Sequence, residues 1–343
     1  MPGPKEVTIY DIARELNISA ATVSRGLKNS PAVHKNTKRK ILETAELLGY
    51  QSNTFASSLR SKRTHSIGVI VPRLNSYFMA SVLAGMEDAA SRAGYNLLIA
   101  QSLEEADKEK ANAEMMFNKR VDGLLVSLAY NTTDLTHFAA FFRRRIPVVF
   151  FDRVHPADNA TSVVIDNFSA AYAVTKHLID QGCSRIMHLG GNLLRNVYRD
   201  RWEGYRKALA DSGLSYSDQL HMISNLSEQS GLDAAARILS MTEADRPDAV
   251  FSANDTAAVH CMIALKAAGI KIPADIAFAG FNNDPISKII EPNLTTVNYS
   301  GYDIGQTAAA NLIDHLKGKT TILHTNMIIL RAGIIIRPSS LKK

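Results

Sequence analysis

Cysteine is nearly absent from the 343-residue sequence, which contains only Cys183 and Cys261. Neither residue stands in a CxxC motif or at the Cys/His spacing of a zinc site. The sequence therefore predicts neither a disulfide framework nor a metal site, and we expect no bound cofactor. Such sparse cysteine usage is typical of a reducing compartment, so we expect a cytoplasmic protein.

Long hydrophobic runs are also missing. No run approaches the roughly 20 apolar residues that a transmembrane helix requires, and residues 1–6 form no apolar segment of the kind found in signal peptides. We expect no membrane association. At this length, two or three domains are expected.

The sequence lacks the motifs of several enzyme classes. No GxGxxG follows the first expected strand, no GxxxxGK[ST] is present, and the ten histidines are scattered without an HExxH spacing. Nucleotide-dependent and zinc-dependent chemistry thus have no support in the sequence. We expect a protein that is not an enzyme.

Positive charge is concentrated at the start of the chain. Residues 1–63 contain eleven Lys or Arg and five Asp or Glu, so their net charge of +6 equals that of the whole chain. Residues 64–343 are neutral overall. A small basic domain is suited to a polyanionic duplex, although a three-helix module that binds protein is an alternative.

The same region has the pattern of a helix-turn-helix. Apolar residues recur at helical spacing in residues 9–16, and Asn17 tolerates the positive φ that a tight reversal needs. Ser19 is a favourable N-cap for a second helix, in which Val23 and Leu27 lie on one side and can pack inward. The other sides of this helix carry small or polar residues, and can therefore lie against a large partner.

Three short runs resemble the DNA-binding headpiece of the lac-repressor (LacI/GalR) family. They are Val7-Thr8-Ile9-Tyr10-Asp11-Ile12-Ala13, Ile18-Ser19 and Ala21-Thr22-Val23-Ser24-Arg25. A third helix over residues 36–48, followed by residues 48–53, resembles the connection to that family's hinge, and the likeness extends to about Ser340. Two departures are Asn17 in place of a turn glycine and His34 in place of a serine that caps the third helix.

The resemblance assigns roles to residues of the headpiece. It implies base reading by Ala20, Ala21 and Arg25, of which Arg25 can bridge guanine O6 and N7. Backbone contacts are expected from five further positions: Thr8, Tyr10, Ser19, Thr22 and Asn29. Residues 54–59 would form a hinge helix in the minor groove, with contacts from Asn53, Ala56 and the apolar wedge Leu59. The alternative is a linker whose Leu59 packs on the core.

Beyond residue 64 the sequence alternates between short apolar runs and helical patterns. Strands are expected at 67–71, 96–100, 123–127, 148–151, 163–165, 186–189, 249–252 and 276–279. Helices are expected at 78–93, 106–119, 135–144, 170–181, 201–212, 231–241 and 256–268. Continuous apolar strands between helices predict parallel sheets buried on both faces.

Two series of these units suggest two lobes with a cleft between them. The predicted fold class is therefore α/β, with an all-α helix-turn-helix headpiece before a two-lobed core. Resemblance implies a core like that of periplasmic binding proteins, in which the chain crosses between lobes three times. The expected domains are a headpiece (1–53), a hinge (54–63) and a core (64–343), divided into lobe one (64–161 and 294–322) and lobe two (162–293 and 323–343).

Candidate effector residues follow the ends of the strands, because ligands of α/β sheets bind there. The resemblance assigns effector contacts to Asp152, Arg201, Asn254 and Asn282, with Phe78 at the cleft mouth. An alternative is that Asn254 caps the following helix and that Asp152 pairs with an arginine. Other candidates in these loops are Arg73, Tyr77, Arg195 and Arg199.

Five arginines fall in loops expected at the cleft: Arg73, Arg153, Arg195, Arg199 and Arg201. They suggest an anionic effector such as a sugar acid or sugar phosphate, whereas arginines at the rim or on a dimer face are the alternative. Together the patterns predict a DNA-binding transcription regulator, more often a repressor in this family. It would bind a palindromic operator as a homodimer under the control of a sugar-like effector. A cytoplasmic sugar-binding protein or an enzyme on the same core is the alternative.

Overall fold

The computed structural model describes residues 7–50, 63–155, 160–322 and 325–342. The chain divides into two compact units, Met1–Thr64 and His65–Lys343. The expected hinge residues Asn53, Ala56 and Leu59 lie outside the described ranges. None of the described helices combines the length and hydrophobicity that crossing a bilayer requires.

The described part of the first unit contains three helices, α1 (Ile9–Glu15), α2 (Ala20–Leu27) and α3 (Lys35–Leu47). Their apolar faces meet in a small core around Ile12, Val23 and Ile41, each fully buried. Between α1 and α2, Asn17 has φ 51°, which confirms the predicted left-handed turn. The side chain of Ser19 accepts a hydrogen bond from the Thr22 amide at 3.1 Å and caps α2, as predicted.

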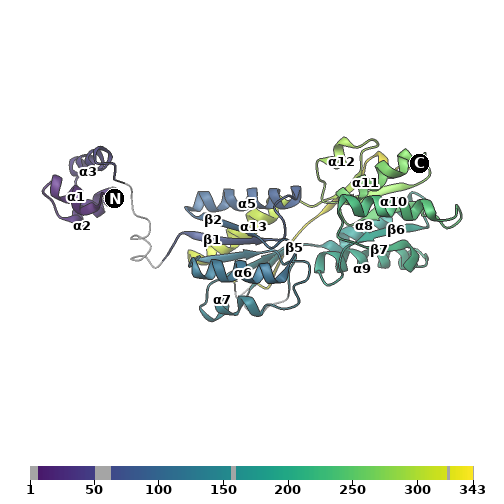
Figure 1. The fold of residues 1–343 in the computed structure, drawn as a ribbon, viewed down its shortest axis with the longest axis horizontal. Helices are drawn as coiled ribbons and strands as arrows, with labels where there is room; N and C mark the ends of the chain where they lie inside the picture. The colour runs from purple at the N-terminus through teal and green to yellow at the C-terminus, as the bar shows by residue number, and fades with distance from the viewer. Residues whose placement is uncertain (1–6, 51–62, 156–159, 323–324, 343) are drawn as a thin grey trace, which may run out of the picture. The chain divides into compact units, whose positions relative to one another are not determined.

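The second unit has two lobes, and each is built on a six-stranded sheet (Figure 1). The first sheet has the order β11-β5-β4-β3-β1-β2 and is entirely parallel. Its strands are β1 (Ser66–Val71), β2 (Asn96–Gln101), β3 (Gly123–Val126), β4 (Val148–Phe151), β5 (Thr161–Ile165) and β11 (Met327–Leu330). The buried, Val/Ile/Leu/Phe-rich central strands explain why their pattern in the sequence is continuous rather than alternating.

Helices cover both faces of the first sheet (Figure 1). One face packs on α5 (Tyr77–Ala93) and α13 (Gly301–Leu316), and the other on α6 (Ala106–Asn118), η1 (Thr136–Phe138) and α7 (Ala139–Arg143). Glycines allow α5 and α13 to approach closely: a Cβ on Gly305 would lie 1.9 Å from the carbonyl oxygen of Val82. The helix pair is therefore packed backbone against backbone.

The second sheet has the order β12-β10-β9-β8-β6-β7 and is parallel except for the antiparallel pair β10–β12. Its strands are β6 (Ile186–Gly190), β7 (His221–Ile223), β8 (Ala249–Ser252), β9 (Ala277–Phe281), β10 (Thr295–Asn298) and β12 (Gly333–Ile335). The helices are α8 (Asn167–Asp180), α9 (Asn196–Asp211), α10 (Glu228–Ser240), α11 (Asp255–Ala267) and α12 (Ile286–Ile289), with the short turns η2 (Asp218–Leu220) and η4 (Pro338–Ser340). The pair α8/α9 covers one face and α10/α11 the other.

The strand pairing assigns three segments to a different lobe from the one expected from the sequence. We expected residues 162–165 and 327–330 in lobe two and 295–298 in lobe one, and these assignments are wrong. β5 pairs with β4 and β11 in the first sheet, whereas β10 pairs with β9 and β12 in the second. The chain therefore crosses between lobes after β5, after β10 and after β11, which agrees with the expected number of crossings.

Candidate functional site

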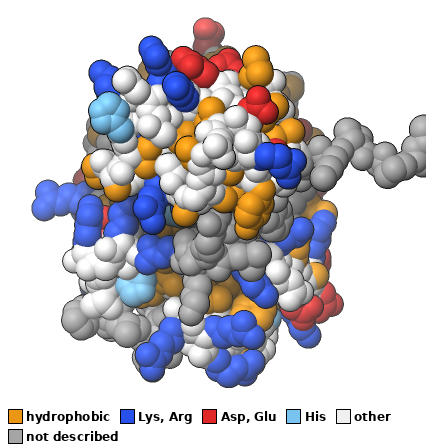
Figure 2. Space-filling view, turned by 90° about the vertical axis from the view of Figure 1, so that its left-hand side faces the viewer, with side chains coloured by type: hydrophobic (Ala, Val, Ile, Leu, Met, Phe, Trp, Pro, Cys, Tyr) orange, Lys and Arg blue, Asp and Glu red, His pale blue; other side chains and the backbone are white. Residues whose placement is uncertain are grey.

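The surface of the headpiece carries most of the residues assigned to DNA. Thr8, Tyr10, Ser19, Ala21, Arg25 and Asn29 are exposed, while Ala20 and Thr22 are half-buried. Figure 2 shows Lys and Arg side chains distributed widely over the face turned toward the viewer. A helix with small residues and an exposed arginine beside many cations has the surface properties that a duplex requires.

Several of these side chains already have partners within the headpiece. The Thr8 hydroxyl donates to Asp11 Oδ2 at 2.7 Å, and the hydroxyls of Ser19 and Thr22 are 2.8 Å apart. Lys38 Nζ donates to Asn29 Oδ1 at 3.0 Å. These bonds fix the orientation of polar groups at the starts of α1 and α2 and just beyond the end of α2.

His34 retains the capping role expected at its position. It stands at the N-cap of α3, where Nδ1 accepts a hydrogen bond from the Asn36 amide at 3.4 Å. The substitution of a serine by His34 therefore preserves the start of the third helix.

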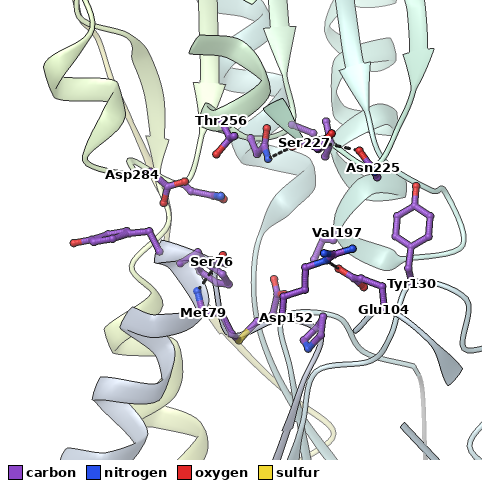
Figure 3. Close-up of a pocket in the computed structure, with 18 of the residues that line it drawn as sticks. Ser76, Met79, Glu104, Tyr130, Asp152, Val197, Asn225, Ser227, Thr256 and Asp284 are labelled. Carbon is purple, nitrogen blue, oxygen red and sulfur yellow. Dashed lines mark hydrogen bonds and ion pairs between the residues drawn. The ribbon is translucent and has the colours of Figure 1, made fainter. Parts of the chain in front are cut away.

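A cavity of about 800 Å³ lies between the two lobes, at the carboxyl ends of the strands (Figure 3). We call it the interlobe cavity. From the first lobe it is lined by residues 72–73, 75–79, 104–105, 130–131 and 152–153. From the second it is lined by residues 197–198, 201, 225–228, 253–254, 256, 260, 282 and 284–286, together with Tyr299 in the crossing after β10. All five principal candidates line it: Phe78, Asp152, Arg201, Asn254 and Asn282.

Aromatic and acidic groups meet at the floor of the interlobe cavity. The rings of Phe78 and Tyr299 are 4.3 Å apart, and Tyr299 donates its phenolic hydrogen to Asp152 Oδ1 at 2.8 Å. Ser127 donates to Asp152 Oδ2 at 3.4 Å. Burial raises the pKa of Asp152, although the neighbouring Arg153 and Arg201 favour its charged form.

Asn254 is engaged as a helix cap, as one of the two interpretations predicted. Its Oδ1 accepts from the Ala257 amide at 3.0 Å, and its Nδ2 donates to the Leu226 carbonyl at 2.8 Å. Asn282 has φ 110° in the loop after β9. Burial raises the pKa of Asp284 to about 6, and the half-buried side chain of Asn282 opposes this rise.

The expected arginine cluster is divided by the fold. Arg73, Arg153 and Arg201 line the interlobe cavity, but Arg195 and Arg199 do not. The helix α9 begins at Asn196 rather than at the predicted residue 201, which makes Arg195 its N-cap and places Arg199 in its second turn. The expectation that all five loop arginines reach the cavity is therefore wrong for these two.

Arg195 and Arg199 have different surroundings. Arg195 is 1% exposed and donates from Nη2 to the carbonyl of Thr132, a contact from lobe two to lobe one. Arg199 is half-exposed and lies 3.4 Å from the adjacent Asp200. Neither position offers its guanidinium to a ligand in the interlobe cavity.

Further hydrogen bonds join the lobes along the same edge of the interlobe cavity. Tyr130 Oη donates to the Ser224 carbonyl at 3.0 Å, and Asn192 Nδ2 donates to the Tyr130 carbonyl at 3.2 Å. Asn196 accepts from the Val154 amide at 2.9 Å. A ligand that enters the cavity thus meets two lobes that are already in contact.

Sequence reasoning did not assign several residues that line the interlobe cavity. Glu104 and Tyr130 follow β2 and β3, and the search for residues past strand ends could have found both. Tyr299 follows β10, whose residues the sequence pattern did not identify as a strand of the second sheet. Its position depends on pairing with β9, a long-range contact that local pattern does not reveal.

The comparisons with known proteins define the class of this chain. Residues 8–53 match the family model "Bacterial regulatory proteins, lacI family", and residues 64–330 match "Periplasmic binding proteins and sugar binding domain of LacI family". The two matches follow the division of the chain into its two compact units. The chain belongs to the LacI family of bacterial regulatory proteins, which confirms the predicted family and fold class.

Individual relatives agree with this assignment. Catabolite control protein A of Priestia megaterium is 34% identical over 315 residues, covering 92% of this chain and 94% of that protein. The HTH-type transcriptional repressor PurR of Photobacterium profundum is 31% identical over 313 residues, covering 91% and 92%. The structure of the transcription regulator CcpA of Lactococcus lactis is 30% identical with a TM-score of 0.72, over 80% of this chain and 98% of that one.

The lac repressor dimer bound to operator and an anti-inducer shows the same fold. It aligns with a TM-score of 0.87 over 98% of this chain and all of that chain, at 24% identity. The chain is a DNA-binding transcription regulator with a ligand-binding core. The relatives are regulators, which favours this function over a free-standing sugar-binding protein or an enzyme.

Proposed function

We propose that this chain is a repressor that binds a palindromic operator as a homodimer and responds to a small, hydroxyl-rich effector in the interlobe cavity. The observation that carries the proposal is the pairing, in one chain, of a basic helix-turn-helix with a large cavity between two lobes. It would act in the cytoplasm, where DNA is accessible. Nothing in this arrangement requires chemistry on the ligand.

Recognition of DNA would use α2 as the helix in the major groove. Arg25 reads a base, while Ala20 and Ala21 permit close approach and contact with a thymine methyl. Groups near the ends of α1 and α2 hold the phosphates and carry no sequence information: Thr8, Tyr10, Ser19, Thr22 and Asn29. For Thr8 and Asn29, the partners Asp11 and Lys38 pre-orient these contacts.

The hinge proposal rests on the resemblance of residues 53–59 to the family. Asn53, Ala56 and Leu59 would contact the minor groove, where an apolar wedge unstacks a base step. Leu59→Ala should then weaken operator binding and leave effector affinity intact. Equal losses of both affinities would contradict the hinge role.

The effector would be held by groups from both lobes. The ring of Phe78 offers an apolar face, and Asp152, Arg201, Asn254 and Asn282 offer donors and acceptors that suit hydroxyl groups. Arg73 and Tyr77 line the mouth and make secondary contacts. Because residues from both lobes would touch it, the effector would change how far the lobes close around the cavity. Through the crossings between the lobes, this closure would alter the DNA affinity of the headpiece.

A homodimer is supported by apolar surface on the first lobe. The edge strand β2 exposes Leu98 and Ile99 by 37% and 45%, and Leu103 in the following loop is 44% exposed. A second copy of the chain would cover these side chains. A two-fold dimer also matches a palindromic operator with two half-sites.

The proposed function is tested by measuring binding of the full chain to labelled duplexes from the region upstream of its own gene. We expect one palindromic site to bind with a steep salt dependence, roughly 10³–10⁵-fold between 50 and 200 mM salt if 6–10 phosphates are contacted. Sedimentation of the complex should give two chains per site. Uniform binding to all duplexes would contradict a sequence-specific repressor.

A further inference from the structure

The charged side chains that line the interlobe cavity include more acids than bases. Arg73, Arg153 and Arg201 are the basic groups, and five carboxylates accompany them: Glu104, Glu105, Asp152, Glu228 and Asp284. The arginines in the sequence suggested an anionic effector, but acidic side chains outnumber them in the lining of the cavity. The charge preference of the cavity depends on which of these groups are not already paired within the protein.

The two arginines of the first lobe share one carboxylate. Arg153 donates to Glu104 Oε2 at 2.6 Å, and Arg73 lies 3.7 Å from the other oxygen of Glu104. Arg153 also donates to the Tyr198 hydroxyl at 2.9 Å. Glu104 therefore compensates one of the two positive charges on this wall within the protein.

Arg201 is likewise held by the protein. Its Nε donates to Asn167 Oδ1 at 2.8 Å and its Nη1 to the Ala253 carbonyl at 2.7 Å, while its guanidinium lies 3.6 Å from the centre of the Phe281 ring. Asp152 lies beside it and compensates its charge. Arg201 is a structural cation of the second lobe as much as a ligand contact.

Asp284 differs from these groups because its carboxyl is incompletely paired. Its backbone amide donates to Asp255 Oδ2 at 2.7 Å, which brings a second, fully buried carboxyl behind it. Within the described part of the chain, Asp284 Oδ1 is buried and accepts no hydrogen bond. Figure 3 shows Asp284 on the wall of the cavity formed by the second lobe.

An incompletely paired carboxyl at a ligand cavity has a defined preference. A hydroxyl or ammonium group of the ligand would stabilise this carboxylate by donating a hydrogen bond to it. A negatively charged ligand group would be repelled, because the two negative charges would lie close together in a poorly solvated site. Glu228 on the same wall contributes a further negative charge, with its carboxylate 3.7 Å from His260 Nε2. The second lobe therefore presents an acidic wall to the effector.

We propose that Asp284 is a specificity-determining residue, which accepts a hydrogen bond from the effector and selects a neutral or amino-bearing polyhydroxyl compound over its carboxylate or phosphate analogue. The proposal rests on the effector role of the interlobe cavity. It assigns to the cavity a charge preference opposite to that indicated by the sequence alone.

The experiment compares matched ligands on the full chain at pH 7.5 by thermal shift and calorimetry. The probes are glucose, glucosamine, glucuronate and glucose 6-phosphate, with the corresponding series built on galactose and ribose. We expect the neutral or amino member of a series to bind at least about tenfold more tightly than its anionic members, the ratio that one hydrogen bond to a charged group supplies. Tighter binding of the acid or the phosphate overturns the proposal.

Two variants then identify the residue. Asp284→Asn keeps the size of the side chain and should reduce the preference by about tenfold, and Asp284→Ser serves if the asparagine variant folds poorly. Asp180→Asn, on the exposed surface of α8, is the matched control and should keep the preference. An unchanged preference in both Asp284 variants overturns the role of this residue.

Operator binding, measured in parallel, separates this proposal from the proposed function. If no probe of any series binds while the full chain still binds its operator specifically, the ligand class is wrong and the DNA-binding function stands. If specific operator binding is also absent, the proposed function itself fails.

Discussion

Tyr299 donates a hydrogen bond to Asp152 at 2.8 Å, and this contact joins the crossing after β10 to the end of β4. Tyr299 is 2% exposed and Asp152 is 6% exposed. The bond thus links one of the three connections between the lobes to the floor of the interlobe cavity. An effector that contacts Asp152 acts directly on a segment that any change of lobe closure must move.

Removal of this bond should destabilise the core. Tyr299→Phe leaves the buried Asp152 carboxyl without its shortest donor, and a lost hydrogen bond to a charged group costs about 1.5–3 kcal/mol. Tyr302→Phe is the matched control, since Tyr302 also donates to a carboxylate, Asp88, but at the exposed surface. Urea unfolding of both variants should show the larger loss for Tyr299→Phe. Equal, small losses of unfolding free energy in the two variants would show that the buried bond contributes no more to stability than the exposed one.

The approach of α5 and α13 should not tolerate a methyl group. Gly305→Ala would place Cβ 1.9 Å from the carbonyl oxygen of Val82, and only a shift of the helix backbone can relieve that contact. We expect a loss of about 3 kcal/mol in the unfolding free energy. Gly333→Ala, at a position with no atom within 4 Å of the added Cβ, should have little effect. Similar stability of the two variants would contradict the close packing.

Stability of the core should fall as the pH rises from about 4 to about 8, through Asp255. Burial, with repulsion from Asp284, raises the pKa of Asp255 to about 8, whereas the unfolded chain has the ordinary value of about 4. Between these values the folded state holds a proton that the unfolded state has released, so a higher pH favours unfolding. Asp255→Asn should flatten this part of the pH profile, measured by thermal unfolding in a buffer series. An unchanged slope would show that Asp255 is not protonated in the fold.

Arg25 should determine the sequence preference of the headpiece. Arg25→Ala is expected to cost about 1–3 kcal/mol of operator affinity and to relax the preference at one base pair in each half-site. Arg39→Ala is the control, because Arg39 is also exposed but lies on α3, 3.7 Å from Glu43. Binding to a set of single-base operator variants distinguishes them. A uniform loss across all operators in Arg25→Ala would make Arg25 a phosphate contact instead.

Local patterns in the sequence predicted most of the elements. Continuous apolar runs located the central strands, and Gly182, Gly213 and Gly269 end their helices with φ of 89°, 71° and 87°, as a C′ glycine should. Asn17 and Ser19 were predicted from turn and cap chemistry alone. These features depend on only a few neighbouring residues, so they can be predicted from the local sequence.

Features that depend on long-range pairing were not predictable in this way. The membership of β5, β10 and β11 follows from crossings between the sheets, and Tyr299 reached the interlobe cavity through one of them. The partners of the arginines were not predictable for a related reason. Whether Arg153 is free for a ligand depends on Glu104, which is 49 residues away in sequence.

The measurement that tests the account most directly is the operator affinity of the full chain as a function of effector concentration. The effector is a compound that stabilises the core, and the readout is fluorescence anisotropy of a labelled operator at fixed salt. We predict a change of roughly 5–150-fold in the dissociation constant, the range of an allosteric coupling of 1–3 kcal/mol. The Asn282→Ala variant should require more effector for the same change. An operator affinity that stays constant while the effector saturates the core would contradict the claim that the interlobe cavity controls DNA binding.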